Sequence, residues 1–266
     1  MKTKTIYLIY ILLLLILISI SQGLKTPKKN PSFIKQLQKN SIYKKENKNR
    51  YLSYKNKYPN ITNRNILIYT NIGLDQEPYS NIKIINQPTK INTLVNKYNY
   101  LDKNYIPNDL ELINSNIKLR KVAKKSFEKL VNSAKKENLY IIPVSGYRSY
   151  IYQEKLYNKY SAIDGKDKAD TYSARPGHSE HQTGLAIDVC TKEKSYIEFE
   201  NTIEFKWMQE NAHKYGFILR YPKNKEHITT YQYEPWHYRY VGVNIATNIY
   251  QKQITFDEYY TIYLDK

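Results

Sequence analysis

Hydrophobic positions begin near the N-terminus, where an uninterrupted apolar run extends from Ile6 to Ile18 behind Lys2 and Lys4. A short basic flank, an apolar stretch of this length and small residues after it are the layout of a secretory signal. The run is short for a membrane-spanning helix of about 20 residues, although it could extend into an uncleaved anchor. We therefore expect residues 1–24 to be a signal peptide or a membrane anchor, and the protein to be exported.

Residues 25–62 have no sustained apolar period and are dense in Lys, Asn, Gln, Ser and Tyr. Such a composition buries little apolar surface, so we expect a polar tether with marginal helix that holds a domain away from a membrane. The short apolar cluster from Ile66 to Tyr69, read I-L-I-Y, predicts a strand. The main folded domain is accordingly expected to span residues 63–266.

A helical period runs from Ile117 to Asn138. Its apolar members follow at intervals of four, three and four residues, which is one face of a helix: Ala123, Phe127, Leu130 and Ala134. A strand is predicted at residues 139–144, and Ser149 is suited to cap a second helix. Arg148 is thereby placed between a strand end and a helix start, a location where functional residues concentrate.

The stretch G-L-A-I-D-V at residues 184–189 alternates as a strand, with Asp188 on the face opposite to Leu185, Ile187 and Val189. Asn201 and Glu204 suggest the N-terminal cap of a following helix, which Gly216 ends. Strands at 217–221 and 236–241 and helices at 244–253 and 256–264 complete the pattern. This irregular order predicts an α+β fold, a single domain with a small, mainly antiparallel sheet flanked by helices.

The chain is strongly basic, with 42 Lys and Arg against 24 Asp and Glu and a formal net charge of +18. This surplus favours an anionic partner such as a cell-wall polymer or a membrane surface, although a codon bias toward Lys, Asn, Ile and Tyr would also produce it. No basic helix with interleaved aromatics, zinc finger or RNA-binding signature is found, so we expect no nucleic-acid partner. The single cysteine, Cys190, excludes an intramolecular disulfide.

Two stretches offer the parts of a hydrolytic metal site. His181 and Asp188 lie in S-E-H-Q-T-G-L-A-I-D-V, and His237 ends E-P-W-H. Two imidazoles and a carboxylate can bind Zn²⁺ and leave a fourth position for water, while Glu234 takes a proton from that water. The same donors also describe non-haem iron sites, but there the first two ligands usually lie closer together in the sequence.

The motifs that carry this chemistry resemble those of the VanY-type D-alanyl-D-alanine carboxypeptidases, zinc peptidases that trim bacterial peptidoglycan stem peptides. The resemblance covers about residues 63–266 and rests on S-G-Y-R-S-Y, Q-E-K-L-Y, P-G-H-S-E-H-Q-T-G-L-A-I-D and E-P-W-H-Y-R-Y. It implies the small α+β domain shared with lysostaphin-like and hedgehog-like proteins. With the predicted leader, we expect a location outside the cytoplasm, with the protein either secreted or anchored to the outer face of the bacterial membrane.

The resemblance also implies a role for each matched residue. His181, Asp188 and His237 match the ligands of one Zn²⁺ per chain, and Glu234 matches the catalytic base. Arg148 matches an arginine that clamps an oxyanion or a carboxylate, a role that suits its fixed charge and forked donors. Two further residues match positions in the pocket for the terminal D-alanine: Gln153 and Ser179. The implied substrate is a peptidoglycan stem peptide ending in D-alanine, and the enzyme is expected to be a monomer.

Several alternatives stay open at this point. The same site could act as a D,D-dipeptidase, an L,D-carboxypeptidase or a peptidoglycan endopeptidase, and a non-catalytic, zinc-stabilised wall-binding module belongs to another class. Arg148 could instead pair with a surface acid. His178 is expected to border the cleft without binding metal, and Trp236 to pack in the core.

Overall fold

The protein is described by a computed structural model, in which residues 31–265 are placed well enough to describe. The predicted signal or anchor and the first residues of the predicted tether lie outside this range. Within it, no helix is both long and apolar enough to cross a membrane. The chain divides at Asn71 and Ile72 into two compact units.

The N-terminal unit is helical. It contains α2 (Pro31–Gln38), the 3-10 turn η1 (Lys45–Asn47), α3 (Lys48–Lys57) and α4 (Asn63–Ile72). These helices enclose a small core: Phe33, Ile34, Leu37, Tyr51, Leu52, Ile66 and Leu67. The unit is therefore more ordered than the marginal helix that we predicted for the tether. The strand predicted from Ile66 to Tyr69 is wrong, because these residues form part of α4 and two of them pack into this core.

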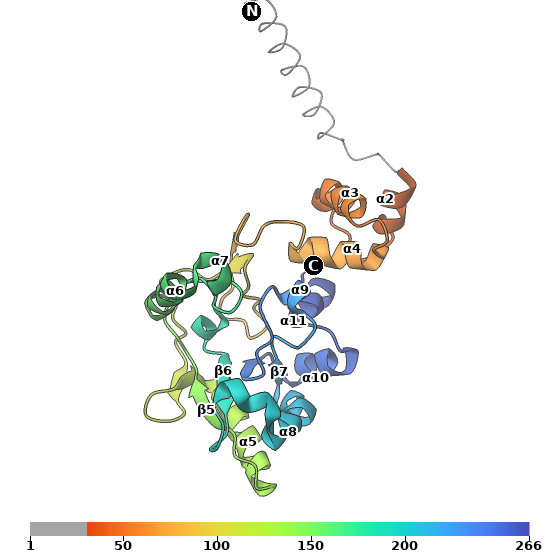
Figure 1. The fold of residues 1–266 in the computed structure, drawn as a ribbon. Coiled ribbons are helices and arrows are strands. Elements are labelled where there is room, and N and C mark those ends of the chain that lie inside the picture. The colour runs from red at the N-terminus through yellow and green to blue at the C-terminus, as the bar shows by residue number, and fades with distance from the viewer. Residues whose placement is uncertain (1–30, 266) are drawn as a thin grey trace, which may run out of the picture. The chain divides into compact units, whose positions relative to one another are not determined.

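The second unit is built on a four-stranded antiparallel sheet with the order β5-β6-β8-β7. Figure 1 labels three of its strands, β5, β6 and β7. Its strands are β5 (Ile142–Ser145), β6 (Ala186–Cys190), β7 (Phe217–Leu219) and β8 (His237–Tyr240). Two smaller pairs accompany it: β1 (Lys83–Ile84) runs parallel to β2 (Asn99–Tyr100), and β3 (Leu110–Leu112) runs antiparallel to β4 (Lys118–Arg120). The predicted α+β class with a mainly antiparallel sheet is confirmed.

Helices flank the sheet. They are α5 (Lys121–Lys136), α6 (Tyr150–Asp164), α7 (Lys166–Ala169), α8 (Ile203–Asn211), α9 (Glu226–Thr229), α10 (Val243–Lys252) and α11 (Phe256–Tyr259). Shorter turns are η2 (Glu180–Thr183), η3 (Tyr196–Asn201), η4 (Ala212–Tyr215) and the π-helical η5 (Tyr260–Leu264).

The predicted apolar face of α5 is confirmed. Its four residues, Ala123, Phe127, Leu130 and Ala134, are buried in one core with Leu185, Ile187 and Val189 of the strand region. The other face of β6 is thereby left to carry Asp188.

Two helix starts were predicted, and one of them is correct. The Ser149 side chain caps α6 by accepting a hydrogen bond from the amide of Tyr152. The cap of α8 is Thr202, whose side chain accepts from the amide of Phe205, and not Asn201. Asn201 ends the preceding turn η3, so the helix begins one residue later than its polar signal suggested.

Candidate active site

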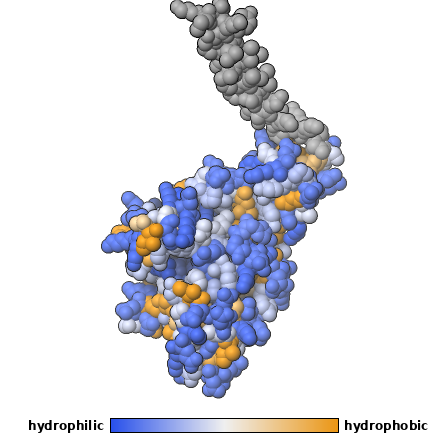
Figure 2. Space-filling model, viewed as in Figure 1, coloured by the Kyte–Doolittle hydropathy of each residue, from blue (hydrophilic) through white to orange (hydrophobic). Residues whose placement is uncertain are grey.

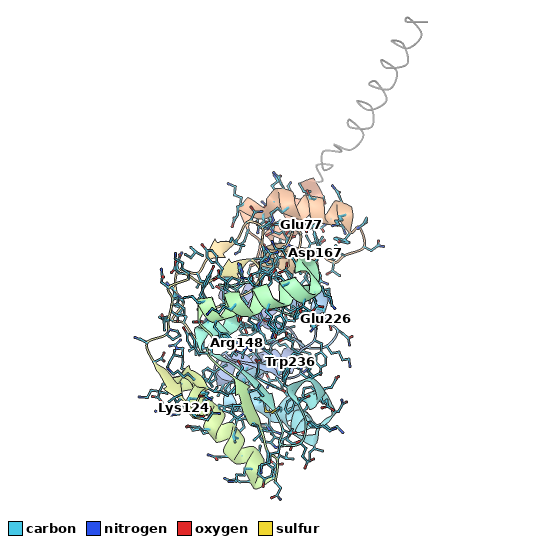
Figure 3. All side chains as sticks on the ribbon, turned by 60° about the vertical axis from the view of Figure 1, so that its left-hand side comes forward. Glu77, Lys124, Arg148, Asp167, Glu226 and Trp236 are labelled. Carbon is cyan, nitrogen blue, oxygen red and sulfur yellow. The ribbon has the colours of Figure 1, made fainter. Side chains whose placement is uncertain are left out.

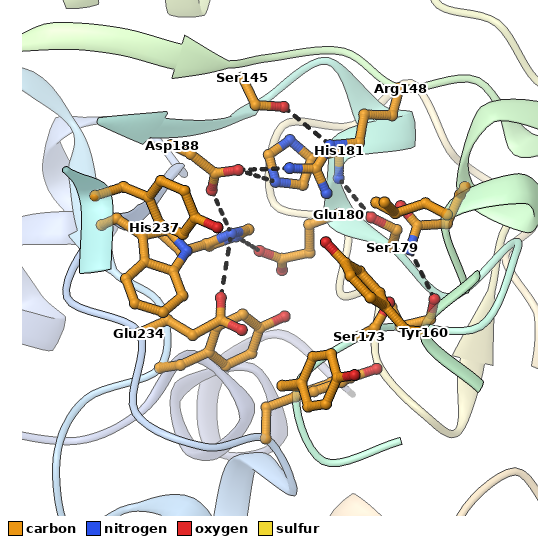
Figure 4. A pocket seen from close by; sticks show the side chains of 18 of the residues that line it. Ser145, Arg148, Tyr160, Ser173, Ser179, Glu180, His181, Asp188, Glu234 and His237 are labelled. Atoms are coloured by element: carbon orange, nitrogen blue, oxygen red, sulfur yellow. Dashed lines mark hydrogen bonds and ion pairs between the residues drawn. The ribbon is translucent and has the colours of Figure 1, made fainter. Parts of the chain in front are cut away.

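The strand register brings together residues that are distant in the sequence. Asp188 of β6 lies directly opposite His237 of β8, and His181 reaches the same place from η2. One ligand atom from each of these three residues lies within 4.8 Å of the other two, and all three side chains are buried (Figure 4). The structure therefore assembles the three predicted metal ligands in one place.

Two glycines allow this close assembly. Gly184 ends η2 in the left-handed region at φ 66°, and a Cβ there would lie 2.8 Å from Leu110. Gly146 approaches the backbone so closely that a Cβ would lie 2.3 Å from the carbonyl oxygen of Lys118. The carbonyl of Gly146 lies 2.6 Å from Nδ1 of His181. Because Nδ1 carries the proton in this contact, the Nε2 lone pair of His181 is free to bind a cation.

The two imidazoles use opposite nitrogens toward the site. Nε2 of His181 lies 3.3 Å from Oδ2 of Asp188, whereas Nδ1 of His237 lies 3.1 Å from Oδ1 of the same carboxylate. Oδ1 of Asp188 is buried and accepts no well-aligned hydrogen bond from the described residues. Buried imidazole nitrogens and carboxylate oxygens that converge on one place suit a cation, and this donor set fits Zn²⁺.

Arg148 occupies the edge of this cluster. Its Nη2 donates to Oδ2 of Asp188 at 2.6 Å, and its Nε donates to Ser145 at 2.9 Å. Arg148 therefore pairs with Asp188, a buried carboxylate of the site, and not with a surface acid, which was the alternative that we considered. Figure 3 labels Arg148 beneath the green helix α6. Arg148 holds Asp188 in place while its guanidinium lines the pocket (Figure 4). Fixed in this way, the guanidinium can also meet an anionic group in the pocket.

Burial sets the protonation of the site when no cation is bound. Burial raises the pKa of Glu234 to about 8, although nearby His237 opposes the shift. Burial, helped by the charge of Arg148, lowers the pKa of His181 to about 4, so this imidazole is neutral at pH 7. Oε2 of Glu234 lies 3.7 Å from Nδ1 of His237. A carboxylate with a pKa near neutrality, beside the ligand cluster, suits a group that accepts and returns a proton.

A pocket of about 740 Å³ surrounds the cluster. Ser179 and Gln153 lie on its wall, where the Ser179 hydroxyl accepts from the amide of His181 and the Gln153 amide donates to Ala174. Oε1 of Gln153 is buried without a partner among the described residues, so it is available to a bound molecule. Their contact with a terminal D-alanine stays a prediction.

The outer wall of this pocket is apolar and aromatic. Exposed side chains there include Tyr152, Ile163 and Ile197, and apolar patches border a hollow on the face shown in Figure 2. Trp236 lies on the wall in edge-to-face contact with Tyr196. The prediction that Trp236 packs in the core is therefore wrong, since the ring is only partly buried.

Other histidines take no part in the cluster. Nδ1 of His178 contacts the carbonyl of Asn96 at 2.8 Å, and its ring packs against Tyr79 and Tyr100. This residue is buried and is not among those that line the pocket, so it packs in the fold and does not border the cleft as predicted.

Three fully buried charges beside the cluster were missed in the sequence: Glu180, Arg220 and Arg239. Arginine in a short apolar strand normally points outward, and nothing in the sequence indicated that these two face one carboxylate. The signal that could have drawn attention to a carboxylate such as Glu180 is the rule that a metal-binding imidazole commonly has a carboxylate on its other nitrogen.

Comparison with known proteins supports the same chemistry. The family model for the VanY D-alanyl-D-alanine carboxypeptidase matches residues 116–243. The protein YodJ of Bacillus subtilis (strain 168), a carboxypeptidase by name, is 40% identical over 198 residues, which make up 70% of this chain and 72% of that protein. Residues 116–243, which the family model matches, include every candidate site residue.

Solved structures agree with this likeness. The LdcB L,D-carboxypeptidase is 41% identical with a TM-score of 0.65, over 69% of this chain and 91% of that chain. A vancomycin-resistance D,D-pentapeptidase VanY solved with Zn(II) is 33% identical with a TM-score of 0.57, over 63% of this chain and 97% of that chain. VanYB in complex with D-alanine-D-alanine is 33% identical with a TM-score of 0.56, over 63% and 96%. This chain belongs to the VanY family of D-alanyl-D-alanine carboxypeptidases.

Proposed function

We propose that this chain is an exported, zinc-dependent carboxypeptidase that removes the terminal D-alanine from peptidoglycan stem peptides. The observation that carries the proposal is the convergence of His181, Asp188 and His237 within 4.8 Å, with the Glu234 carboxylate 3.7 Å from His237. This is the donor set of a hydrolytic zinc site, with a proton acceptor beside it. The Zn(II) in a related VanY structure supports the choice of metal.

The cation, when bound, polarises the scissile carbonyl and makes a water molecule more acidic. Glu234 takes the proton from the attacking water and passes it to the amine that leaves. The closeness of His237 and the low polarity around Glu234 keep its proton affinity near that needed at neutral pH. Arg148 stabilises the negative charge that develops on the carbonyl oxygen, or holds the terminal carboxylate of the substrate, from the same pocket wall.

An L,D-carboxypeptidase is a second candidate function. It is favoured by one observation, the higher identity and TM-score to the LdcB structure than to the VanY structures. Both activities release one D-alanine and differ in the residue that precedes it. The D-alanine-D-alanine bound to VanYB supports the D,D reading.

Export is part of the proposal and rests on the apolar run from Ile6 to Ile18 with its basic flank. The substrate class supports it as well, because a stem peptide in the wall lies outside the cytoplasm. Protease added to intact cells should digest the protein, and protection from that protease would contradict export.

The function is tested with residues 25–266, which retain both compact units. This protein is incubated with a muramyl pentapeptide ending in D-Ala-D-Ala and with the corresponding tetrapeptide, with and without a chelator, and the products are weighed. Loss of one alanine from the pentapeptide, abolished by the chelator and restored by Zn²⁺, is the expected result. Preferential cleavage of the tetrapeptide would identify the L,D activity, and intact peptides would reject both.

A further inference from the structure

The side of His237 that faces away from the site meets a buried carboxylate. Nε2 of His237 lies 3.6 Å from Oε2 of Glu180, and neither atom has a hydrogen-bond partner among the described residues. The separation is slightly longer than an ordinary hydrogen bond, so a small rotation of the ring closes it. Both side chains are almost fully excluded from solvent, which makes an unpartnered donor or acceptor costly here.

The other oxygen of Glu180 is already occupied. Oε1 accepts from Nε of Arg220 at 2.9 Å and from Nη1 of Arg239 at 2.8 Å. Arg220 in turn donates to Asp257 of α11 at 2.6 Å, and Asn96 donates to the same carboxylate at 3.0 Å. Two arginines and two carboxylates give this buried group no net charge. Glu180 is thus held in place by two arginines, and its Oε2 lies toward the imidazole of His237.

A purely structural network of arginines and carboxylates does not require that Oε2 of Glu180 face His237. Arg239 also donates to the carbonyls of Ile91 and Thr93, so contacts to the backbone already fix its position. A buried ion network is seldom more stable than apolar packing of the same volume, so stability alone does not account for this one. Both arginines donate to Oε1 of Glu180, so Oε2 accepts from neither of them and faces His237.

We propose that Glu180 is a positioning residue for the metal site, which accepts the Nε2 proton of His237 and so keeps the Nδ1 lone pair directed at the cation. The proposal deepens the proposed function, because it explains how one ligand is held in the tautomer that can bind. A partner of this type typically contributes about 10-fold to 100-fold to metal affinity.

Glu180→Gln tests the role sharply. The amide oxygen of glutamine can still accept from Arg220 and Arg239, while its NH₂ group now faces Nε2 of His237. This donor stabilises the tautomer with the proton on Nδ1, which cannot bind the cation. We expect the Zn²⁺ dissociation constant, measured by competition with a chromogenic chelator, to rise about 10-fold to 100-fold. Unchanged zinc affinity in the folded variant would overturn the proposal.

Asp257→Asn is the matched control, since it disturbs the same ion network on the side remote from His237. It should lower the melting temperature and leave zinc affinity within about 3-fold of wild type. An equal loss of zinc affinity in both variants would reduce Glu180 to a structural residue and overturn the proposal.

If Glu180→Gln does not fold, a ¹H–¹⁵N spectrum of the zinc-loaded wild-type protein decides. A proton on Nε2 of His237 supports the proposal, and a proton on Nδ1 overturns it. Neither readout depends on which peptide the enzyme cleaves.

The distribution of charge carries a second, independent inference. Residues 31–71 contain nine Lys and Arg against one acidic residue, a net charge of +8, whereas residues 72–266 contain 28 against 23, a net charge of +5. A codon bias toward lysine would raise the basic count in both units but would not remove acids from one of them. The surplus that we noted for the whole chain is therefore concentrated in the helical N-terminal unit.

The basic side chains of this unit are largely exposed, and they surround a core that the unit forms by itself. Pro31, where the described part begins, is 13 residues after the end of the apolar run at Ile18, a distance of at most about 47 Å of extended chain. We propose that the N-terminal unit binds an anionic membrane surface through these lysines. Each lysine near such a surface contributes about 1 kcal/mol.

Sedimentation of residues 25–266 with lipid vesicles tests this second proposal. Binding is expected to vesicles that contain phosphatidylglycerol and not to pure phosphatidylcholine. Changing Lys35, Lys39, Lys45 and Lys48 to Gln should weaken it about 100-fold or more. The matched control changes four exposed lysines of α5 to Gln and should have little effect: Lys125, Lys129, Lys135 and Lys136. Equal loss in both variants, no binding, or tighter binding to soluble polyglycerol phosphate than to vesicles would overturn the proposal.

Discussion

Asp188 faces His237 directly across the antiparallel pair of β6 and β8, with Oδ1 of the carboxylate 3.1 Å from Nδ1 of the imidazole. The same carboxylate accepts from Arg148 at 2.6 Å through its other oxygen. Asp188 therefore links the other metal ligands to the guanidinium of Arg148, which lines the pocket. Its charge is needed both for the metal and for Arg148, so its replacement should affect binding before it affects the fold.

Asp188→Asn should weaken Zn²⁺ binding by at least about 100-fold, because a neutral amide replaces a charged ligand at nearly the same shape. Thermal unfolding measured with and without Zn²⁺ checks this, since a ligand that binds only the native state raises the melting temperature. The rise should be lost in the variant. Asp167→Asn, an exposed change on α7, is the control and should keep the full rise. A normal zinc-dependent shift in Asp188→Asn would exclude Asp188 as a ligand.

Glu234→Gln should keep bound zinc and lose hydrolysis. The glutamine side chain fills the same buried space but cannot accept a proton, and general-base catalysis contributes about 100-fold to 10,000-fold. Turnover of the pentapeptide and zinc content per chain are measured on the same sample. Undiminished turnover would remove Glu234 from the mechanism, and loss of zinc would indicate that it is a ligand.

The candidate ligands could be predicted from the sequence because their signals are local. His181 and Asp188 lie seven residues apart around Gly184, and the alternation in β6 already placed Asp188 on the face away from the core. The closeness of His237 to Asp188 could not be deduced from the alternation of apolar and polar residues, because it depends on which strands pair and in what register. The resemblance to a family supplied that link.

The remaining features depend on contacts between distant residues. The role of Glu180 depends on Arg220 and Arg239, which lie 40 and 59 residues away and whose strands read as ordinary amphipathic segments. The helical content of the N-terminal unit was underestimated for a related reason. The core residues are few on each short helix, three on α2 and two on α3, and they form a core only when α4 packs with them.

Gly146→Ala should destabilise the protein by about 1–3 kcal/mol, since the new Cβ would lie 2.3 Å from the Lys118 carbonyl and 2.8 Å from Ile117. For a unit of this size that corresponds to about 2–4 °C per kcal/mol in melting temperature. Zinc affinity should fall as well, because the carbonyl of Gly146 orients His181. Lys118→Ala is the control, as it keeps the backbone carbonyl and removes only an exposed side chain. A melting temperature equal to that of wild type would show that the backbone here yields easily.

Lys97 gives the protein a pH-dependent stability that is independent of the metal site. Its ammonium donates to the carbonyl of Thr230 at 2.7 Å and lies 4.6 Å from the ring centre of Tyr231, with only 4% of the residue exposed. Burial lowers the pKa of Lys97 from 10.5 to about 8. The native state therefore binds this proton less tightly than the unfolded chain does, and stability rises with pH between these two values.

Lys97→Met isolates this contribution. The melting temperature of wild type minus that of the variant should increase as the pH is raised from about 7 to 10, because the unfolded chain keeps its proton until about pH 10.5. At pH 7 Lys97 is protonated in both the native and the unfolded state, so the wild type carries the full cost of burying the charge. Lys103→Met, at an exposed position on the same segment, should give a difference that does not vary with pH. A flat or falling difference for Lys97→Met would contradict the lowered pKa.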